Sequence, residues 1–281
     1  MQKYEFRFRK KFGQNFLLDA HVLERIIAAA DLSGDDLAIE IGPGIGTLTQ
    51  YLCYYAGKVE AIEIDSRLLP ILEDTLSDWD NAEVIRGDVM EMDLAALIAE
   101  KRGDLSGVRI VANLPYYITT PVLMKILEGE LPVNSVTVMV QEEVADRMRA
   151  KPGTDNFGAF SLAVQYYAVP QVAAHVPPNC FTPRPNVGSA VITLTPIPKE
   201  DRVPVRDPVF LFRVIRASFE QRRKTLVNSL RGAAGLRRKD GKPFTREEIE
   251  EALALCGIPA GVRGEKLSLE EFARLSDALM H

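Results

Sequence analysis

The tetrapeptide Asn113-Leu114-Pro115-Tyr116 contains the residue types that methylation of an amino nitrogen requires. The Asn113 side-chain oxygen and the Leu114 carbonyl oxygen can each accept a hydrogen bond from an exocyclic amino group, and the Tyr116 ring offers a stacking surface. Two such bonds would orient the nitrogen lone pair and stabilise the positive charge that develops on it. A nucleic-acid base is the first candidate substrate, although glutamine or a small amine could use a similar motif. We interpret the neighbouring Tyr117 as ordinary loop packing.

A glycine-rich segment, Glu40-Ile41-Gly42-Pro43-Gly44-Ile45-Gly46-Thr47, follows an apolar run and opens a helical pattern. Its glycines permit a tight turn and close approach of a ligand to the backbone. A dinucleotide fingerprint would need glycine where Thr47 stands, which disfavours a nicotinamide-dependent reductase. The segment is similar instead to the first motif of S-adenosylmethionine-dependent methyltransferases, so Gly42 and Gly44 are candidate cofactor contacts.

Two carboxylates extend this pattern along the chain. Glu63 lies about 20 residues after the glycine loop, at the end of the second predicted strand, where a carboxylate can accept hydrogen bonds from both ribose hydroxyls of an adenosyl group. Asp88 ends the third predicted strand and can accept a bond from the adenine amino group. Together with the glycine loop and Asn113, these residues occupy four successive strand ends, which share one edge of a parallel sheet. Such a row fits one extended nucleoside ligand, and the predicted cofactor is S-adenosylmethionine.

The elements that must position these residues alternate between strands and helices. Strands are predicted at residues 37–41, 59–64, 82–85, 108–112, 135–140 and 189–194, and helices at 47–55, 66–76, 94–101, 120–127 and 142–150. This alternation is typical of a largely parallel sheet covered on both faces, so the fold class is α/β with a Rossmann-like methyltransferase sheet. We expect the proline-punctuated stretch 170–185 to be a rigid connector.

A second group of prolines, in residues 195–208, indicates a domain boundary. We expect residues 1–198 to form the methyltransferase domain with a basic N-terminal arm. Residues 199–281 are expected to form a small basic helical domain that contacts RNA or the ribosome. Two capping boxes, Thr245 to Glu248 and Ser268 to Glu271, predict helices in this region.

Composition and charge narrow the class of protein. No apolar run approaches the roughly 18 residues that span a bilayer and the start lacks a secretory signal, so we expect a cytoplasmic protein. The three cysteines and three histidines show neither disulfide nor metal-ligand spacing, and no metal is expected. The net charge of -5 would disfavour a nucleic-acid partner, yet residues 202–242 hold twelve Lys and Arg against three acidic residues. Such a patch attracts a polyanion through counterion release, and residues 3–11 form a second basic cluster.

Taken together, the motifs resemble the KsgA family, the small-subunit ribosomal RNA adenine N6,N6-dimethyltransferases. The resemblance rests on Lys11–Leu17, the glycine loop, Asn113–Tyr116, Phe157–Gly158, Gln165–Tyr167, Phe181–Ser189 and Gln221–Leu226. The family's cofactor contacts fall here on Asn15, Leu17, Gly42, Glu63, Asp88 and Asn113. Phe181 matches an aromatic residue that helps to hold the target adenine. The most specific motif includes Arg222, Arg223 and Lys224, which we expect to bind RNA.

The resemblance implies dimethylation of two adjacent adenosines in a hairpin loop near the 3′ end of 16S rRNA, within the small ribosomal subunit or its precursor. It also implies a monomer that acts in ribosome biogenesis. Two alternatives stay open. An Erm-type enzyme would modify large-subunit RNA through the same catalytic loop, but Gln165–Tyr167 and Gln221–Lys224 argue against it. A non-catalytic RNA-binding assembly factor could share the fold, but the intact glycine loop and Asn113 argue against lost catalysis.

Overall fold

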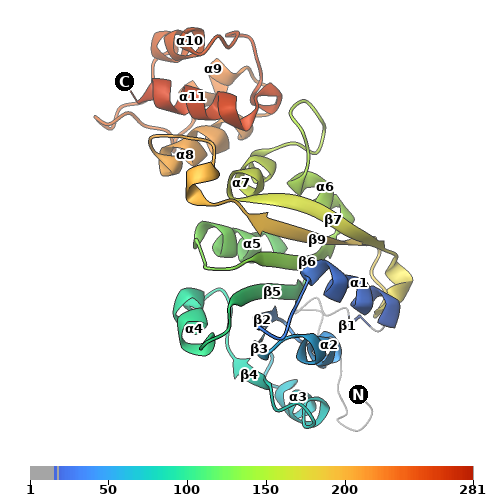
Figure 1. Cartoon of the computed structure of the whole chain (residues 1–281). Helices are drawn as coiled ribbons and strands as arrows, with labels where there is room; N and C mark the ends of the chain where they lie inside the picture. Colours follow the sequence, from blue (N-terminus) through green and yellow to red (C-terminus); the bar gives the residue numbers. More distant parts are fainter. Residues whose placement is uncertain (1–15, 18, 281) are drawn as a thin grey trace. The chain divides into compact units, whose positions relative to one another are not determined.

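The computed structural model describes residues 16–17 and 19–280 and is built around a seven-stranded sheet of order β4-β3-β2-β5-β6-β9-β7 (Figure 1). Its strands are β2 (Asp36–Ile41), β3 (Lys58–Glu63), β4 (Ala82–Arg86), β5 (Gly107–Asn113), β6 (Ser135–Gln141), β7 (Ala168–Val176) and β9 (Ser189–Pro196). The first five strands in this sheet order, β4 to β6, run parallel to one another, whereas β9 pairs antiparallel with both β6 and β7. A separate two-stranded sheet pairs β1 (Phe16–Leu17) with β8 (Phe181–Thr182).

Helices connect the parallel strands and cover the sheet on both faces. They are α1 (Ala20–Ala30), α2 (Thr47–Tyr55), α3 (Leu69–Thr75), α4 (Leu94–Lys101), α5 (Thr119–Glu128) and α6 (Glu142–Met148). In Figure 1, α4 and α5 lie on one side of the sheet and α1 and α2 on the other. Every residue of β2 is buried, as expected for a strand covered on both faces. The α/β prediction is confirmed, and the six predicted strands agree with the observed ones to within two residues.

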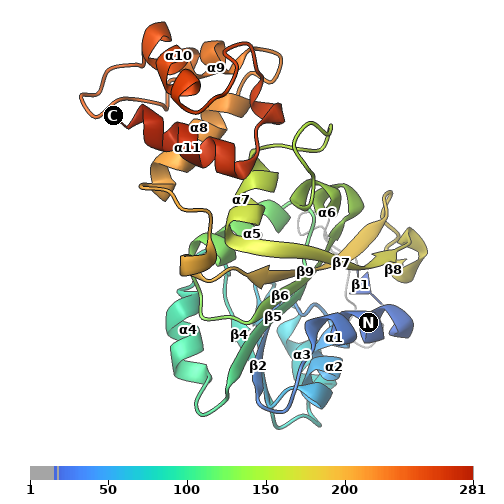
Figure 2. The same cartoon turned by 45° about the horizontal axis from the view of Figure 1, so that its top comes forward.

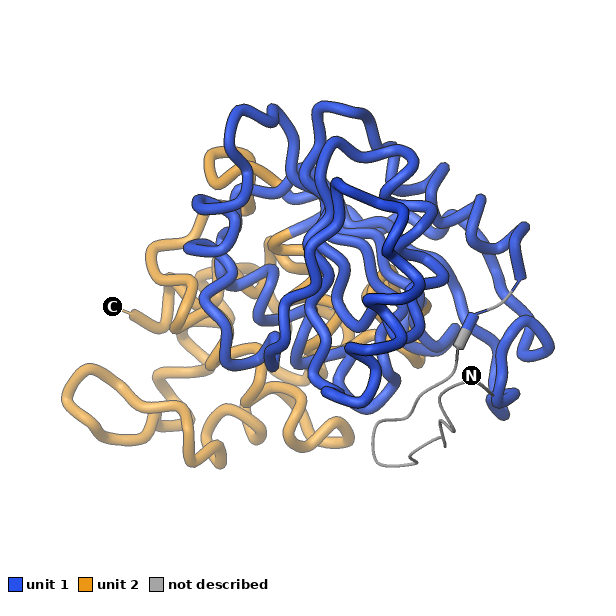
Figure 3. Tube along the Cα trace, turned by 90° about the horizontal axis from the view of Figure 1, so that it is seen from below, with its two compact units in different colours: residues 1–145, 168–196 blue, residues 146–167, 197–281 orange. Residues whose placement is uncertain are grey.

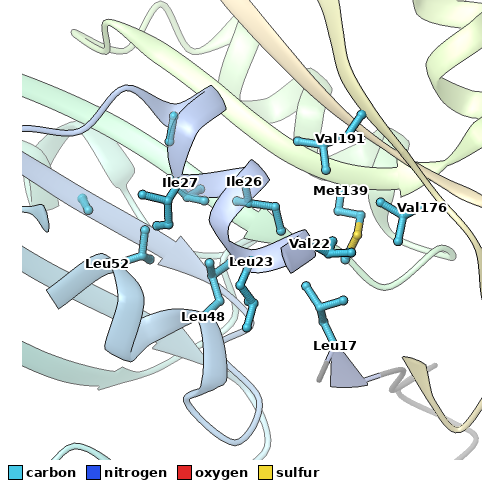
Figure 4. Close-up of a cluster of buried hydrophobic side chains, with 14 of the residues drawn as sticks. Leu17, Val22, Leu23, Ile26, Ile27, Leu48, Leu52, Met139, Val176 and Val191 are labelled. Carbon is cyan, nitrogen blue, oxygen red and sulfur yellow. The ribbon is translucent and has the colours of Figure 1, made fainter. Parts of the chain in front are cut away.

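One face of the sheet is closed by α1, whose apolar residues recur at helical spacing. Asp19 caps this helix, because its carboxylate accepts hydrogen bonds from the backbone N–H groups of His21 and Val22. Leu23 and Ile26 are each 1% exposed and pack with residues of α2, β6, β7 and β9 (Figure 4). The helix therefore joins the parallel half of the sheet to its antiparallel half.

The edge strand β7 departs from the sequence-based expectation, which treated residues 170–185 as a connector. Residues 168–176 form a strand that contains Pro170 and pairs only with β9. An edge strand tolerates proline, because an N–H on its outer side has no ladder partner to lose. The register also shifts between Val172 and Ala174, as in a β-bulge. The connector prediction was wrong for this segment.

The chain divides into two compact units (Figure 3). The first comprises Met1–Ala145 and Ala168–Pro196 and contains the sheet, and the second comprises Asp146–Tyr167 and Ile197–His281. The sequence led us to expect a single boundary at residue 198. The second unit additionally takes in residues 146–167, an excursion of the chain between β6 and β7.

The second unit is helical, with α7 (Ala159–Tyr167), α8 (Pro208–Phe219), α9 (Leu226–Gly232), α10 (Arg246–Leu255) and α11 (Leu269–Leu279). The last four of these helices gather into a bundle (Figure 2). Aromatic contacts attach α7 to it, since the ring of Tyr167 stacks on Phe212 with centroids 5.6 Å apart. This packing explains why residues 146–167 belong to the C-terminal unit, because aromatic side chains of this segment pack on Phe212 and Phe219 of α8.

Candidate active site

A cavity of about 240 Å³ lies in the first unit, at the carboxyl ends of β2, β3, β4 and β5. Its lining includes most of the residues that the sequence nominates: Leu17, Gly42, Gly44, Glu63, Asp88, Asn113, Leu114 and Tyr116. They lie within one cavity because the carboxyl ends of parallel strands share an edge of the sheet. Asn15, nominated with them, lies outside the described residues.

The glycine loop between β2 and α2 has a backbone that only glycine adopts readily. Gly42, Gly44 and Gly46 have φ angles of +74°, +62° and +85°. Side chains at such angles are strained, and a Cβ on Gly46 would also lie 3.0 Å from Thr75 Cγ2. At Gly42 and Gly44, which line the cavity, the loop thus presents backbone that carries no side chain.

Glu63 at the end of β3 is held from both sides by backbone groups. Its Oε2 accepts a hydrogen bond from the N–H of Gly44 at 3.3 Å, and its Oε1 accepts one from the N–H of Asp65 at 2.7 Å. The residue is 4% exposed, and burial raises the pKa of its carboxyl above the ordinary value. The side chain is therefore fixed at the cavity wall beside the glycine loop.

Glu40, the first residue of the glycine motif, is a second buried carboxyl in the lining that our sequence analysis did not nominate. It is 1% exposed, and its Oε2 has no hydrogen-bond partner among the described residues. Burial, with a smaller contribution from the Glu63 carboxylate, raises the pKa of Glu40 to about 8. An unsatisfied buried oxygen costs free energy, so this wall of the cavity suits a ligand that carries hydrogen-bond donors or positive charge.

Asp88 follows β4 and faces the same cavity from the next strand end. Its Oδ1 accepts a hydrogen bond from the N–H of Met90 at 2.8 Å, which orients the carboxylate within a tight turn. Met90 and Ile64 also line the cavity and are 39% and 50% exposed. The part of the cavity near Asp88 therefore combines acceptor oxygens with exposed apolar surface, which suits a flat base with amino groups.

The loop after β5 positions the catalytic candidates. Asn113 is half-buried at the strand end, and Leu114 is 1% exposed, so its side chain anchors the loop in the core. The Tyr116 hydroxyl lies 2.9 Å from the Ser189 Oγ, at the start of β9. This bond fixes the direction of the Tyr116 ring relative to the sheet.

Tyr117 differs from the packing role that we assigned to it. It lines the cavity and is 58% exposed. Burial raises the pKa of its hydroxyl, and the carboxylates of Asp88 and Glu63 add to the rise. The side chain therefore lies at the rim of the cavity, in the field of two nominated carboxylates. Periodicity gave no signal for this, since it reports burial and not the direction of a loop side chain.

Phe181 is not among the residues that line the cavity. It is 5% exposed and belongs to the buried apolar cluster that also contains Leu17, Val22 and Val176. Its strand β8 pairs with β1, which sets Phe181 opposite Leu17, and Leu17 itself lines the cavity. The assignment of Phe181 to the target adenine stays a prediction.

The nominated basic residues belong to the second unit, in the turn between α8 and α9. The guanidinium of Arg222 donates to the backbone carbonyls of Asp155 and Phe157 at 3.0 and 3.2 Å and lies 3.7 Å from a carboxylate oxygen of Glu265. Arg223 and Lys224 are exposed, and in the described part of the chain their side chains form no hydrogen bond or ion pair. Of these three side chains, only that of Arg222 bonds to other described residues.

Within residues 16–17 and 19–280, no three or more His, Cys, Asp or Glu side chains form a group that could hold a metal ion. None of the helices in these residues has both the length and the apolar character that a membrane span needs.

Comparison with known proteins gives consistent matches along nearly the whole chain. A family model described as ribosomal RNA adenine dimethylase matches residues 5–254. A protein of Lachnoclostridium phytofermentans named ribosomal RNA small subunit methyltransferase A is 53% identical over 280 residues, which cover 99% of this chain and 94% of the relative. A protein of the same name from Geobacillus thermodenitrificans is 52% identical and covers 100% of this chain and 94% of the relative.

Solved structures match the fold. A dimethyladenosine transferase from Plasmodium falciparum superposes with a TM-score of 0.77 at 24% identity, over 92% of this chain and 95% of the other. The 23S rRNA methyltransferase ErmE superposes with a TM-score of 0.65 at 25% identity, over 95% and 100%. The chain thus shares its fold with a dimethyladenosine transferase and with a 23S rRNA methyltransferase.

Proposed function

The chain belongs to the ribosomal RNA adenine dimethylase family, and on that premise we propose that it dimethylates N6 of two adjacent adenosines near the 3′ end of 16S rRNA. S-adenosylmethionine is its cofactor. The observation that carries the proposal is the row of four successive strand ends, the glycine loop, Glu63, Asp88 and Asn113, in the lining of one cavity. The small-subunit specificity is supported by relatives that are about half identical over the full chain and bear that name.

The cavity fits the cofactor's chemistry on features of this chain. The buried carboxyl groups of Glu40 and Glu63 suit a ligand with an ammonium group and hydroxyl donors, and the backbone at Gly42 and Gly44 permits its close approach. We assign Glu63 to the ribose hydroxyls and Asp88 to the adenine amino group. When bound, S-adenosylmethionine supplies a methyl group activated by its sulfonium.

The catalytic task of the protein is to present an amino nitrogen in the correct direction. Adenine N6 is a weak nucleophile, because its lone pair is delocalised into the ring. Hydrogen bonds accepted by the Asn113 side-chain oxygen and the Leu114 carbonyl oxygen would direct that lone pair and stabilise positive charge on nitrogen. Tyr116 would stack on the base, and its bond to Ser189 holds the ring ready for it. Phe181 would assist from its position beside Leu17.

RNA binding is assigned to the second unit. Arg223 and Lys224 are exposed cations in the turn between α8 and α9, and such groups bind phosphates with release of counterions. Arg222 carries a positive charge at the same turn and bonds to backbone carbonyls within the protein. Its contact with RNA stays a prediction. We expect the protein to act as a monomer in the cytoplasm, where it meets the small ribosomal subunit or its precursor.

The proposal is tested with radiolabelled S-adenosylmethionine and with small and large ribosomal subunits that lack the modification. After separate incubations, the label is mapped to nucleotides. We expect label on N6 of two adjacent adenosines of the small subunit. Label on the large subunit would favour an Erm-type activity, and no label on either subunit would favour a non-catalytic assembly factor.

A further inference from the structure

Tyr116 and Tyr117 are adjacent in sequence and both line the cavity, yet their hydroxyls have different surroundings. Both belong to the tight turn after β5, in which the N–H of Ile118 donates to the carbonyl oxygen of Pro115. The Tyr116 hydroxyl bonds to Ser189 on β9, two strands from β5 on one side. Tyr117 lines the cavity together with Glu63 and Asp88, at the ends of β3 and β4 on the other side of β5, and after burial the carboxylates of these two residues raise the pKa of its hydroxyl. The turn therefore serves two different parts of the site.

The surroundings of Tyr117 combine apolar surface with acceptor oxygens. Its ring is 58% exposed, and Ile64 and Met90 in the same lining are 50% and 39% exposed. Exposed side chains of this size at a cavity rim leave apolar area that a ligand would remove from water. Burial and the carboxylates of Asp88 and Glu63 all raise the pKa of the Tyr117 hydroxyl, which keeps it protonated and able to donate.

We propose that Tyr117 is a cofactor-binding residue, whose ring covers the adenosyl part of S-adenosylmethionine at the cavity rim beside Ile64 and Met90. The inference rests on the proposed function and assigns the two adjacent tyrosines to different ligands. Tyr116 serves the target base, on the side of β9, and Tyr117 serves the cofactor, on the side of β3 and β4. A flat aromatic ring suits this task, because it can stack on the face of a base without a specific pattern of hydrogen bonds.

The test measures binding of S-adenosylhomocysteine in the absence of RNA, by titration calorimetry on the full chain. Tyr117→Ala is expected to weaken the affinity by about tenfold or more, as for the loss of one base-stacking ring. Tyr117→Phe keeps the ring and is expected to stay within about threefold of the parent, the range of one weak hydrogen bond. Tyr54→Ala is the matched control, because Tyr54 is also an exposed tyrosine of the first unit, at 72%, and does not line the cavity.

An unchanged affinity of Tyr117→Ala for S-adenosylhomocysteine would overturn the inference. If the same variant also had a raised KM for RNA, the Tyr117 ring would be assigned to the target base. Thermal melts verify that each variant is folded, and Tyr117→Leu provides a second variant that fills the space without a flat ring. Leu is expected to weaken binding as Ala does. A parent protein that binds no S-adenosylhomocysteine would contradict the proposed function itself, so the two failures are distinguishable.

Discussion

Asn113 is the residue to which we assign the side-chain hydrogen bond to the target amino group. It ends β5, it lies in the cavity lining, and the next residue, Leu114, is buried and fixes the loop. In this proposed role Asn113 would act mainly on the charge that develops during methyl transfer, so its loss should affect the rate more than the binding of RNA.

Asn113→Ala is accordingly expected to lower the single-turnover rate of methyl transfer by at least ~100-fold, the scale of one lost transition-state hydrogen bond. Affinity for RNA should remain within about threefold of the parent, because the phosphate contacts are made elsewhere. Rapid-quench assays give the rate and filter binding gives the affinity. A near-normal rate would contradict the role assigned to Asn113.

Glu40 gives a second prediction at the scale of one residue, concerning stability and pH. Its pKa is raised from 4.5 to about 8 in the folded protein. Below pH 4.5 the carboxyl is protonated in both states. Between these values the unfolded chain releases the proton while the folded protein keeps it, so the free energy of unfolding falls as pH rises.

Glu40→Gln removes this contribution. In thermal melts without cofactor, we expect the Tm of Glu40→Gln minus the Tm of the parent to increase as the pH is raised from about 4.5 to about 8. Above about pH 8 this difference should stay constant. Glu143→Gln, a change at an exposed carboxylate that does not line the cavity, should show no such trend. Parallel Tm curves for Glu40→Gln and the parent would show that Glu40 does not titrate in this range.

At the scale of elements, the turn between α8 and α9 joins three segments of the second unit. Arg222 bonds to carbonyl groups of the loop 151–157, and the same loop donates from Gly153 to the carbonyl oxygen of Glu265 at 2.7 Å. The two adjacent arginines therefore differ: Arg222 bonds to the loop 151–157, whereas the Arg223 side chain forms no hydrogen bond or ion pair among the described residues.

Arg222→Ala is therefore expected to lower the free energy of unfolding by about 1 kcal/mol, the size of a half-exposed, charge-assisted hydrogen-bond pair. Arg223→Ala is the matched control and should change it by less than about 0.5 kcal/mol. Urea unfolding measures both. Equal losses in the two variants would mean that the bonds of Arg222 contribute nothing to stability.

The elements also show what sequence patterns predict and what they miss. The parallel strands were predicted because short segments rich in apolar and β-branched residues, such as Val136–Val140, alternate with helical patterns along the chain. β7 was missed because Pro170 reads as a break unless one knows that the strand lies at an edge. The row of site residues was predicted because these residues lie at strand ends. The place of Tyr117 at the cavity depends on a turn and on the spatial order of the strands, and neither can be read from spacing along the sequence.

At the scale of the whole molecule, a net charge of -5 coexists with a basic turn and basic C-terminal residues. Binding of RNA should then depend on a few local phosphate contacts. The double change Arg223→Gln with Lys224→Gln is expected to weaken binding and to flatten the slope of log affinity against log salt by up to about one unit per lost contact. Filter binding at several salt concentrations measures the slope, and an unchanged slope would place the RNA elsewhere.

The antiparallel end of the sheet has a consequence for synthesis of the protein. β9 inserts between β6 and β7, although residues 146–167 intervene in the chain and belong to the other unit. In the finished fold the first six residues of β6 are all buried. In a nascent chain that ends at residue 145, one edge of β6 would be open and prone to pairing with other chains. The catalytic unit of this ribosomal RNA methyltransferase is thus complete only when residue 196 has emerged from the ribosome that makes it.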